Sequence, residues 1–194
     1  FFDALVHAEQ APRHDADGKL NVYEGCMPIE VMARRGPDTI RFGPAGTSES
    51  FKAMGYKNSK DIPAHTARFG LHAFEYQCGR GVRLSDETAA AIRANAQGLD
   101  IRFSVHAPYY ISMSSLEEDK RLASVDYILQ SCRAVRALGG SRVIFHAGSC
   151  GKQSRQEALR KALDTMARAQ AAVDEAGYGD ITLCPETMGK INQL

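Results

Sequence analysis

From about residue 39 onward, short apolar runs alternate with longer segments in which apolar residues recur every three or four positions. The short runs are rich in Val, Ile and Phe and are typical of buried strands, whereas the longer amphipathic segments predict helices. We expect strands at residues 39–42, 73–76, 101–106, 143–145 and 181–183. Strand, helix and strand repeated in this way indicate right-handed crossovers and a parallel sheet.

Serine and acidic residues mark where the helices begin. Ser85 is a good N-cap for the helix after the second strand. Two S-x-x-E boxes, Ser115 with Glu118 and Ser154 with Glu157, predict the starts of two long helices. The residues that we expect these helices to bury are Leu122, Val125, Leu129, Cys132 and Val135 in the first and Leu159, Ala162, Leu163, Met166, Ala169 and Val173 in the second.

The order of elements predicts an α/β protein with a partial (β/α)8 TIM barrel. An open doubly wound sheet is the structural alternative, but it usually carries a G-x-G-x-x-G loop after its first strand. The segment at residues 43–46 reads GPAG and does not match that loop. We therefore place about five β/α units of a barrel in residues 41–194, where a closed barrel has eight. No residue is assigned to an organic cofactor.

The composition is that of an ordinary globular protein. Hydrophobic residues make up 44% and charged residues 24% of the chain. No apolar run approaches the ~20 residues of a membrane helix, and the N-terminus lacks the pattern of a secretory signal, so we expect no membrane partner. Five scattered cysteines without a C-x-x-C pair favour a reducing, cytoplasmic location. The net charge of +1 neither supports nor excludes a nucleic-acid partner.

Three residues that can bind a metal stand at equivalent points of successive units. His106 closes the third strand, His146 closes the fourth, and Glu186 follows the fifth, with a spacing of 40 residues in both cases. The carboxyl ends of barrel strands build the active site at one rim. Two imidazoles and a carboxylate suit Zn²⁺ or Mn²⁺. A single strand-end histidine is more often a core residue, but the three together favour a metal site.

The segments around these residues resemble a known family. SVHAPYY at residues 104–110, VIFHAGS at 143–149 and PETMG at 185–189 are similar to three signatures of the endonuclease IV family, the type-2 AP endonucleases, which share a xylose isomerase-like barrel. They include its H-x-x-Y and F-H-x-G-S segments and occur in the family's order. The resemblance covers residues 41–194.

This resemblance implies a metal-dependent DNA-repair hydrolase of base excision repair that cuts the phosphodiester bond 5′ to an abasic site. It implies that His106, His146 and Glu186 bind Zn²⁺ or Mn²⁺ and that Glu186 bridges two metals as the catalytic carboxylate. It also implies that Tyr109 and Tyr110 contact DNA that contains an abasic site. The family's remaining ligands come from strands beyond the fifth, so we expect this fragment to be incomplete.

Basic residues and cysteines also lie near the predicted rim. Arg80, Lys152 and Arg155 stand in loops after strand ends or at the next helix start, where they could hold DNA phosphates. Scattered solvated charge is an equally good interpretation for each of them. We interpret Cys150 and Cys184 as packing residues.

Residues 1–40 do not fit the barrel. The segment YEGCMPIEVMARRG at residues 23–36 resembles an internal stretch of folate- and FAD-dependent tRNA (uracil-5-)-methyltransferases, and this resemblance extends over residues 1–43. In that family, the cysteine that matches Cys26 is linked to flavin or methyl-transfer chemistry. We expect residues 1–40 to pack weakly or to be disordered, because their native partner domain is missing.

Other functions remain open at this point. Related barrels are sugar-phosphate isomerases or epimerases, which use metals at the same rim. An inactive fragment that binds metal or nucleic acid is a further possibility, as is a fragment of a tRNA uracil-5-methyltransferase. The aromatic pair Tyr109 and Tyr110 favours the nuclease.

Overall fold

A computed structural model describes residues 13–14, 20–21 and 40–194. Strands β1 (Arg13–His14) and β2 (Leu20–Asn21) pair in antiparallel register. The expectation of a weakly packed segment at residues 1–40 falls mostly outside the described residues.

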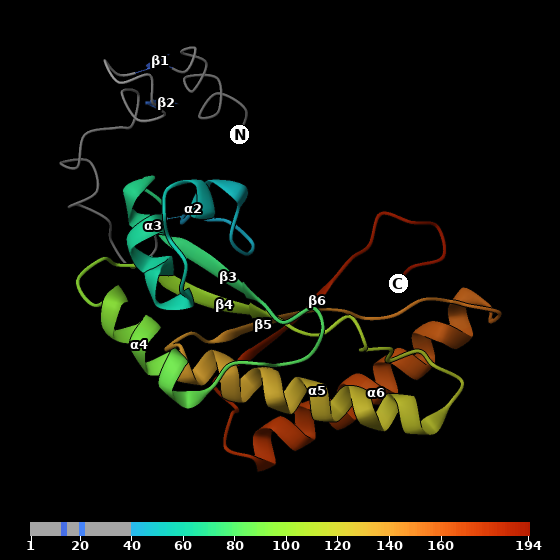
Figure 1. The fold of residues 1–194 in the computed structure, drawn as a ribbon. Coiled ribbons are helices and arrows are strands. Elements are labelled where there is room, and N and C mark those ends of the chain that lie inside the picture. Colours follow the sequence, from blue (N-terminus) through green and yellow to red (C-terminus); the bar gives the residue numbers. More distant parts are fainter. Residues whose placement is uncertain (1–12, 15–19, 22–39) are drawn as a thin grey trace.

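The rest of the described chain forms a four-stranded parallel sheet in the order β3-β4-β5-β6 with helices between the strands (Figure 1). This is part of a TIM barrel, as the sequence predicts. The elements are α2 (Glu49–Ala53), η2 (Ser59–Asp61), α3 (Ile62–Arg68), β3 (Ala73–Gln77), α4 (Asp86–Ala96), β4 (Arg102–His106), α5 (Glu118–Ala137), β5 (Arg142–His146), α6 (Arg155–Glu175) and β6 (Thr182–Glu186). The short helices α2 and η2 are not predicted by the sequence pattern.

The segment that precedes these elements runs beside β3, but it is shifted from the strand predicted at residues 39–42. Thr39 is outside the described residues, and the backbone contacts with β3 are made by residues 42–46. Phe42 O accepts hydrogen bonds from His72 and Ala73, and Gly46 N donates to Glu75 O at 2.9 Å. A Cβ atom on Gly43 would lie 1.6 Å from Ala73 O, so this close approach requires glycine.

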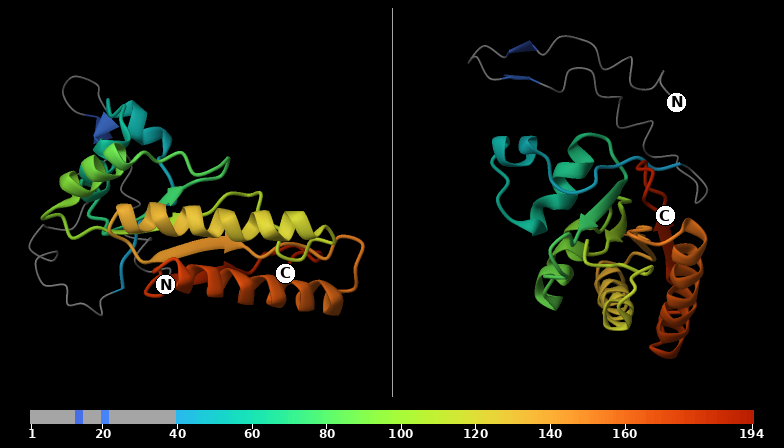
Figure 2. Two further views of the ribbon diagram at one scale, coloured as in Figure 1. Left: turned by 90° about the horizontal axis from the view of Figure 1, so that it is seen from below. Right: turned by 90° about the vertical axis from the view of Figure 1, so that its right-hand side faces the viewer.

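The core lies between the sheet and the helices α4, α5 and α6, which lie side by side outside the curved sheet (Figure 2). Alternate residues of β4 and β5 point to this layer, and among them Val105, Val143 and Phe145 have no exposed surface. Apolar side chains on one side of the strands thus leave most of the other side to polar residues.

The helix starts agree with the sequence at two of the three capping sites. Ser85 accepts from Thr88 N, and Ser154 forms a reciprocal capping box with Glu157. The box predicted at Ser115 is wrong. Helix α5 has Glu117 as its N-cap, with no side-chain cap, because the chain still forms a turn at residues 112–115.

The prediction of which residues the two long helices bury is also partly wrong. Small residues of α6 contact the core, namely Ala158, Ala162, Thr165, Ala169 and Val173. Leu159 and Leu163 lie about 100° further round the helix and are 47% and 60% exposed. In α5, Leu122 is 47% exposed, whereas Cys132 and Val135 are buried as expected. Within the described part of the chain, no helix combines the length and the apolar character needed to cross a membrane.

An aromatic cluster anchors the short helices beside β3. The imidazole of His65 has ring centroids of Phe51, Tyr56 and Phe69 at 5.1, 5.4 and 4.9 Å, all in edge-on arrangements. Its Nε2 lies 3.4 Å from Ser50 Oγ. Burial, with a smaller effect of a nearby arginine, lowers the pKa of His65 below its usual value of 6.5. The neutral ring is therefore the form that this cluster stabilises.

We predict that this histidine makes folding pH-dependent. Because the folded-state pKa is below the unfolded value, the contribution of neutral His65 is fully present above about pH 6.5 and is lost as the pH falls through the folded pKa. In His65→Phe, the ring contacts persist but the titration is absent. Urea unfolding at several pH values from 5 to 8 should therefore show a smaller fall in the free energy of unfolding toward acid than in the parent. Parallel curves for the two proteins would contradict this.

Candidate metal centre

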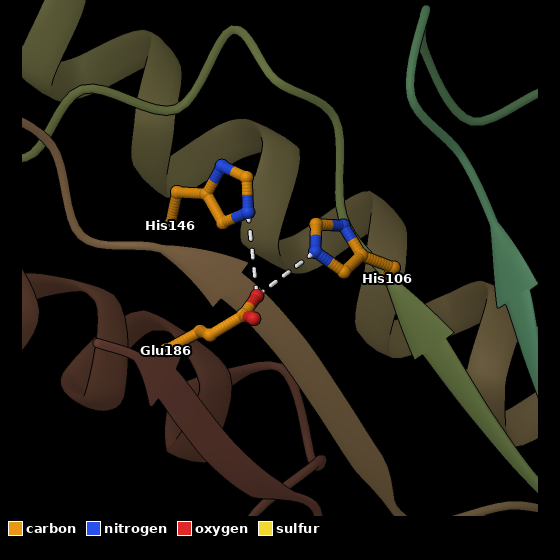
Figure 3. Close-up of side chains that lie close together, drawn as sticks. All are labelled: His106, His146 and Glu186. Carbon is orange, nitrogen blue, oxygen red and sulfur yellow. Dashed lines mark hydrogen bonds and ion pairs between the residues drawn. The ribbon is translucent and has the colours of Figure 1, made fainter. Parts of the chain in front are cut away.

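Three potential ligands meet where strands β4, β5 and β6 end. His106 Nε2 and His146 Nε2 each lie 3.3 Å from Glu186 Oε2. One ligating atom from each residue lies within 4.8 Å of the others, and in Figure 3 the two rings point at the same carboxylate. The structure therefore brings together the three residues that the sequence singles out.

Strand register explains why these side chains meet. His146 and Glu186 are direct partners across β5 and β6, and His106 pairs with Ile144 across β4 and β5. Since alternate residues face the same side of a strand, His106, Ile144 and His146 share one face of the sheet. That face is opposite to the helix layer, so the polar side chains converge without disturbing the core.

The donor set fits a divalent metal ion. Two ligands bound to a tetrahedral ion at ~2.0–2.1 Å lie about 3.3 Å apart, and both histidine-to-Glu186 separations are 3.3 Å. The Nδ1 of His106 lies 3.0 Å from Ala107 O, a contact that is a hydrogen bond only if Nδ1 carries the proton. In the neutral ring, the lone pair of Nε2 then faces a carboxylate oxygen. The lone pair and the carboxylate oxygen repel each other, and a proton or a metal ion between the two atoms removes this repulsion.

The three side chains differ in exposure. His106 is almost fully buried with 9% of its side chain exposed, His146 has 26% and Glu186 has 47%. The centre is thus closed on the side of β4 and open on the side of β6. A bound ion would be accessible to solvent and to a ligand from the carboxylate side.

The two candidate tyrosines are placed differently. The ring of Tyr109 lies over the centre, with its centroid 5.6 Å from that of His146 and 5.9 Å from that of His106. The ring of Tyr110 instead lies 5.7 Å from that of Tyr127 on α5. Both are exposed, at 61% and 56%. Tyr109 therefore borders the metal centre, and Tyr110 presents an aromatic surface beside α5.

The basic candidates separate into two groups. Arg80 and Lys152 are exposed in the loops that follow β3 and β5, with no ion-pair partner among the described residues. Arg155 is already engaged, since its guanidinium donates to the carbonyl oxygens of Ile191 and Gln193. Arg155 thus holds the segment after Glu186 in place, a role that the sequence analysis did not foresee.

Of the two cysteines near the rim, Cys184 is a poor metal ligand and Cys150 is buried. Burial raises the pKa of the Cys184 thiol, with a smaller opposing effect of Arg142, and its Sγ donates to Thr182 O. A protonated thiol binds metal weakly. Cys150 is buried, and its backbone N–H donates to Asn192 O at 2.7 Å.

Gly148, two residues after His146, is a site feature that spacing alone does not reveal. It has φ +118°, and a Cβ there would lie 2.6 Å from Ser114 Oγ. That hydroxyl donates to Ser149 O at 2.7 Å. The glycine and serine of the F-H-x-G-S segment therefore dock the loop after His146 onto the loop after β4.

Comparison with known proteins identifies the family of this chain. The model of the xylose isomerase-like TIM barrel family matches residues 63–194, more than half of the chain. The chain belongs to the xylose isomerase-like TIM barrel family. The matched residues include the whole of strands β3 to β6 and the three potential ligands.

Solved structures share the fold at low sequence identity. D-psicose 3-epimerase from Clostridium cellulolyticum, with D-tagatose, has a TM-score of 0.58 and 15% identity over 77% of this chain and 50% of that chain. A D-tagatose 3-epimerase-like protein has a TM-score of 0.59 and 19% identity over 80% of this chain and 56% of that chain. Endonuclease IV from Thermus thermophilus, at 21% identity over 67% of this chain and 47% of that chain, reaches a TM-score of only 0.42, too low to carry an argument. These likenesses establish the fold alone.

Curated relatives match a part of the chain. A methylenetetrahydrofolate–tRNA-(uracil-5-)-methyltransferase TrmFO of Moorella thermoacetica is 64% identical over 44 residues, which are 23% of this chain and 10% of the relative. The enzyme of the same name from Lactobacillus delbrueckii subsp. bulgaricus is 36% identical over 136 residues, 70% of this chain and 24% of the relative. The chain thus spans a tenth to a quarter of these relatives.

We predict that Zn²⁺ or Mn²⁺ raises the melting temperature of the chain. A ligand at 100 times its Kd stabilises the folded state by about 2.7 kcal/mol, which corresponds to roughly 5–10 °C for a domain of this size. His146→Ala should lose most of this gain, whereas His65→Phe, which changes a histidine outside the centre, should keep it. Differential scanning fluorimetry with metal and with chelator measures both. Equal melting temperatures of the parent in the two buffers would contradict the metal centre.

We also predict that Gly148→Ala destabilises the fold by about 1–3 kcal/mol, because alanine at this positive φ is strained and its Cβ displaces Ser114. Gly179→Ala is the matched control, since its Cβ meets only the end of the Asp174 side chain at 3.2 Å. Urea unfolding of both variants provides the comparison. A loss as small as that of the control would show that the loop tolerates the methyl group.

Proposed function

We propose that this chain carries the metal-binding part of a DNA-repair phosphodiesterase that cleaves 5′ to abasic sites. The observation that supports this best is the convergence of His106, His146 and Glu186 beneath the exposed ring of Tyr109. These residues belong to the segments whose sequences resemble the endonuclease IV family. A sugar isomerase or epimerase of the same barrel needs the metal but has no evident use for an additional exposed tyrosine such as Tyr110.

The ligands have distinct tasks in this proposal. His106 and His146 would hold the ion through their Nε2 atoms, and Glu186 would add a carboxylate oxygen. When bound, Zn²⁺ or Mn²⁺ lowers the pKa of a water molecule and polarises a phosphoryl oxygen. Because Glu186 is half exposed, its second carboxylate oxygen would be accessible to hold a proton or a further ligand. In this proposal, Glu186 is the catalytic carboxylate.

The remaining candidates position the DNA. Arg80 and Lys152 are exposed in the loops after β3 and β5, where cationic groups suit the phosphates of DNA. Exposed aromatic rings such as Tyr109 and Tyr110 suit a base or the gap left by a missing base, and stacking of this kind contributes about 1–3 kcal/mol per base. The substrate is thus held by charge and stacking rather than by base-edge contacts.

We propose a cytoplasmic location from the state of the cysteines. The described cysteines Cys78, Cys132, Cys150 and Cys184 are all free, which suits a reducing cytoplasm.

The resemblance to the endonuclease IV family implies further ligands on strands that follow β6. The match to the solved D-psicose 3-epimerase covers 50% of that chain. We therefore expect the chain by itself to cleave more slowly than a barrel with eight strands.

The test is cleavage of a duplex oligonucleotide with one abasic site. We expect metal-dependent incision on the 5′ side, and Glu186→Gln should lower the rate at least about 100-fold, since loss of several kcal/mol of charge stabilisation slows a reaction by that factor or more. Arg80→Ala and Lys152→Ala should each weaken DNA binding several-fold. Each should also reduce the slope of log K against log salt concentration by about one.

Two controls separate the alternatives. An undamaged duplex should remain uncut, and ketoses such as D-fructose should show no epimerisation with the same metal. Turnover of a ketose without incision of DNA would assign the centre to the epimerase class. Metal binding without either reaction would leave an inactive binding fragment.

A further inference from the structure

The two histidines of the centre are held in different ways. His106 is buried, and its Nδ1 lies 3.0 Å from the Ala107 carbonyl oxygen, to which it donates when Nδ1 carries the proton. For His146, no hydrogen bond to Nδ1 is found among the described residues, and a quarter of its side chain is exposed. Both rings contact Glu186 through Nε2, and they differ on the Nδ1 side, where His106 faces a backbone carbonyl oxygen and His146 has no such partner among the described residues.

Tyr109 packs against His146. Its ring is stacked on the imidazole of His146 at an interplanar angle of 30° with centroids 5.6 Å apart. The ring of His106 meets His146 edge-on at 83° and 5.0 Å. Among its ring neighbours, His146 thus has one stacked ring, that of Tyr109, and one edge-on ring, that of His106.

Gly79 explains why a ring that is 61% exposed stays in this place. The backbone N–H of Tyr109 donates to Gly79 O at 3.1 Å. A Cβ on Gly79 would lie only 2.7 Å from Cε2 of the Tyr109 ring. The φ of Gly79 is outside the positive region, so the backbone itself accepts alanine. The absence of a side chain at this position is what lets the ring lie beside the end of β3.

We propose that Tyr109, seated on Gly79, is a positioning residue that orients His146 for the metal ion. The Tyr109 ring does for His146 what the Ala107 carbonyl does for His106. This inference rests on the metal centre of the proposed function, but it requires neither DNA nor catalysis. It also gives Tyr109 a role beyond the DNA contact that the family resemblance implies.

The experiment measures the affinity of the full chain for Co²⁺ and Zn²⁺, by the visible absorption of Co²⁺ and by competition with a chromophoric chelator. Loss of a group that orients a ligand typically lowers metal affinity about 10–100-fold. We expect at least a tenfold loss in Tyr109→Ala, and Tyr109→Phe, which keeps the ring, should restore the parent affinity. Melting temperatures without metal should be similar in all of these proteins, since the ring is largely exposed.

Gly79 supplies the sharper test through a double-mutant cycle. Gly79→Ala should lower the affinity several-fold because the methyl group moves the Tyr109 ring. In the Tyr109→Ala background, the same change should have no further effect, since the ring is already gone. Gly179→Ala, at a distant turn, should leave the affinity unchanged.

The outcomes separate this inference from the proposed function. A parent that binds metal while Tyr109→Ala binds it equally well would overturn the positioning role and leave the metal centre intact. An equal loss from Gly79→Ala in both backgrounds would also overturn it, because Gly79 would then act on the centre without Tyr109. A parent that binds no metal would overturn both.

Discussion

The site depends above all on the parallel register of β4, β5 and β6. His146 and Glu186 are direct partners, and His106 lies one inward-facing position lower on its strand. A slip of one residue would turn one ligand toward the helices. That slip is prevented on the opposite side of the sheet, where Val143 and Phe145 are fully buried against the helix layer. The apolar core therefore sets the geometry of the polar rim.

Close contacts in the loops complete what the strands begin. Gly148 lets the loop after β5 dock onto Ser114, and Gly79 lets the ring of Tyr109 reach the imidazoles. Each position lacks a side chain because another group needs the space. Since one barrel fold can host unrelated reactions, the fold alone does not decide the reaction.

Much of this arrangement was predictable from the sequence. Four of the five predicted strands are present with ends within three residues of the prediction, because an apolar run between helices has few other ways to bury itself. The capping box at Ser154 is local chemistry and forms as predicted. The three potential ligands could be singled out because a barrel repeats one β/α unit, so that equal spacing along the chain becomes one rim in space.

The sequence by itself thus determined the class of fold, the order of its elements and the residues at the strand ends, since these follow from local pattern and repeat length. Only the tertiary structure decided which side of α6 is buried: small residues fit closely against the neighbouring elements, and Leu163 is turned outward. It also decided that Tyr109 rests on Gly79 and stacks on His146. Such contacts join residues from different loops, and their distances depend on how the strands are curved and stacked, which no periodicity along the chain records.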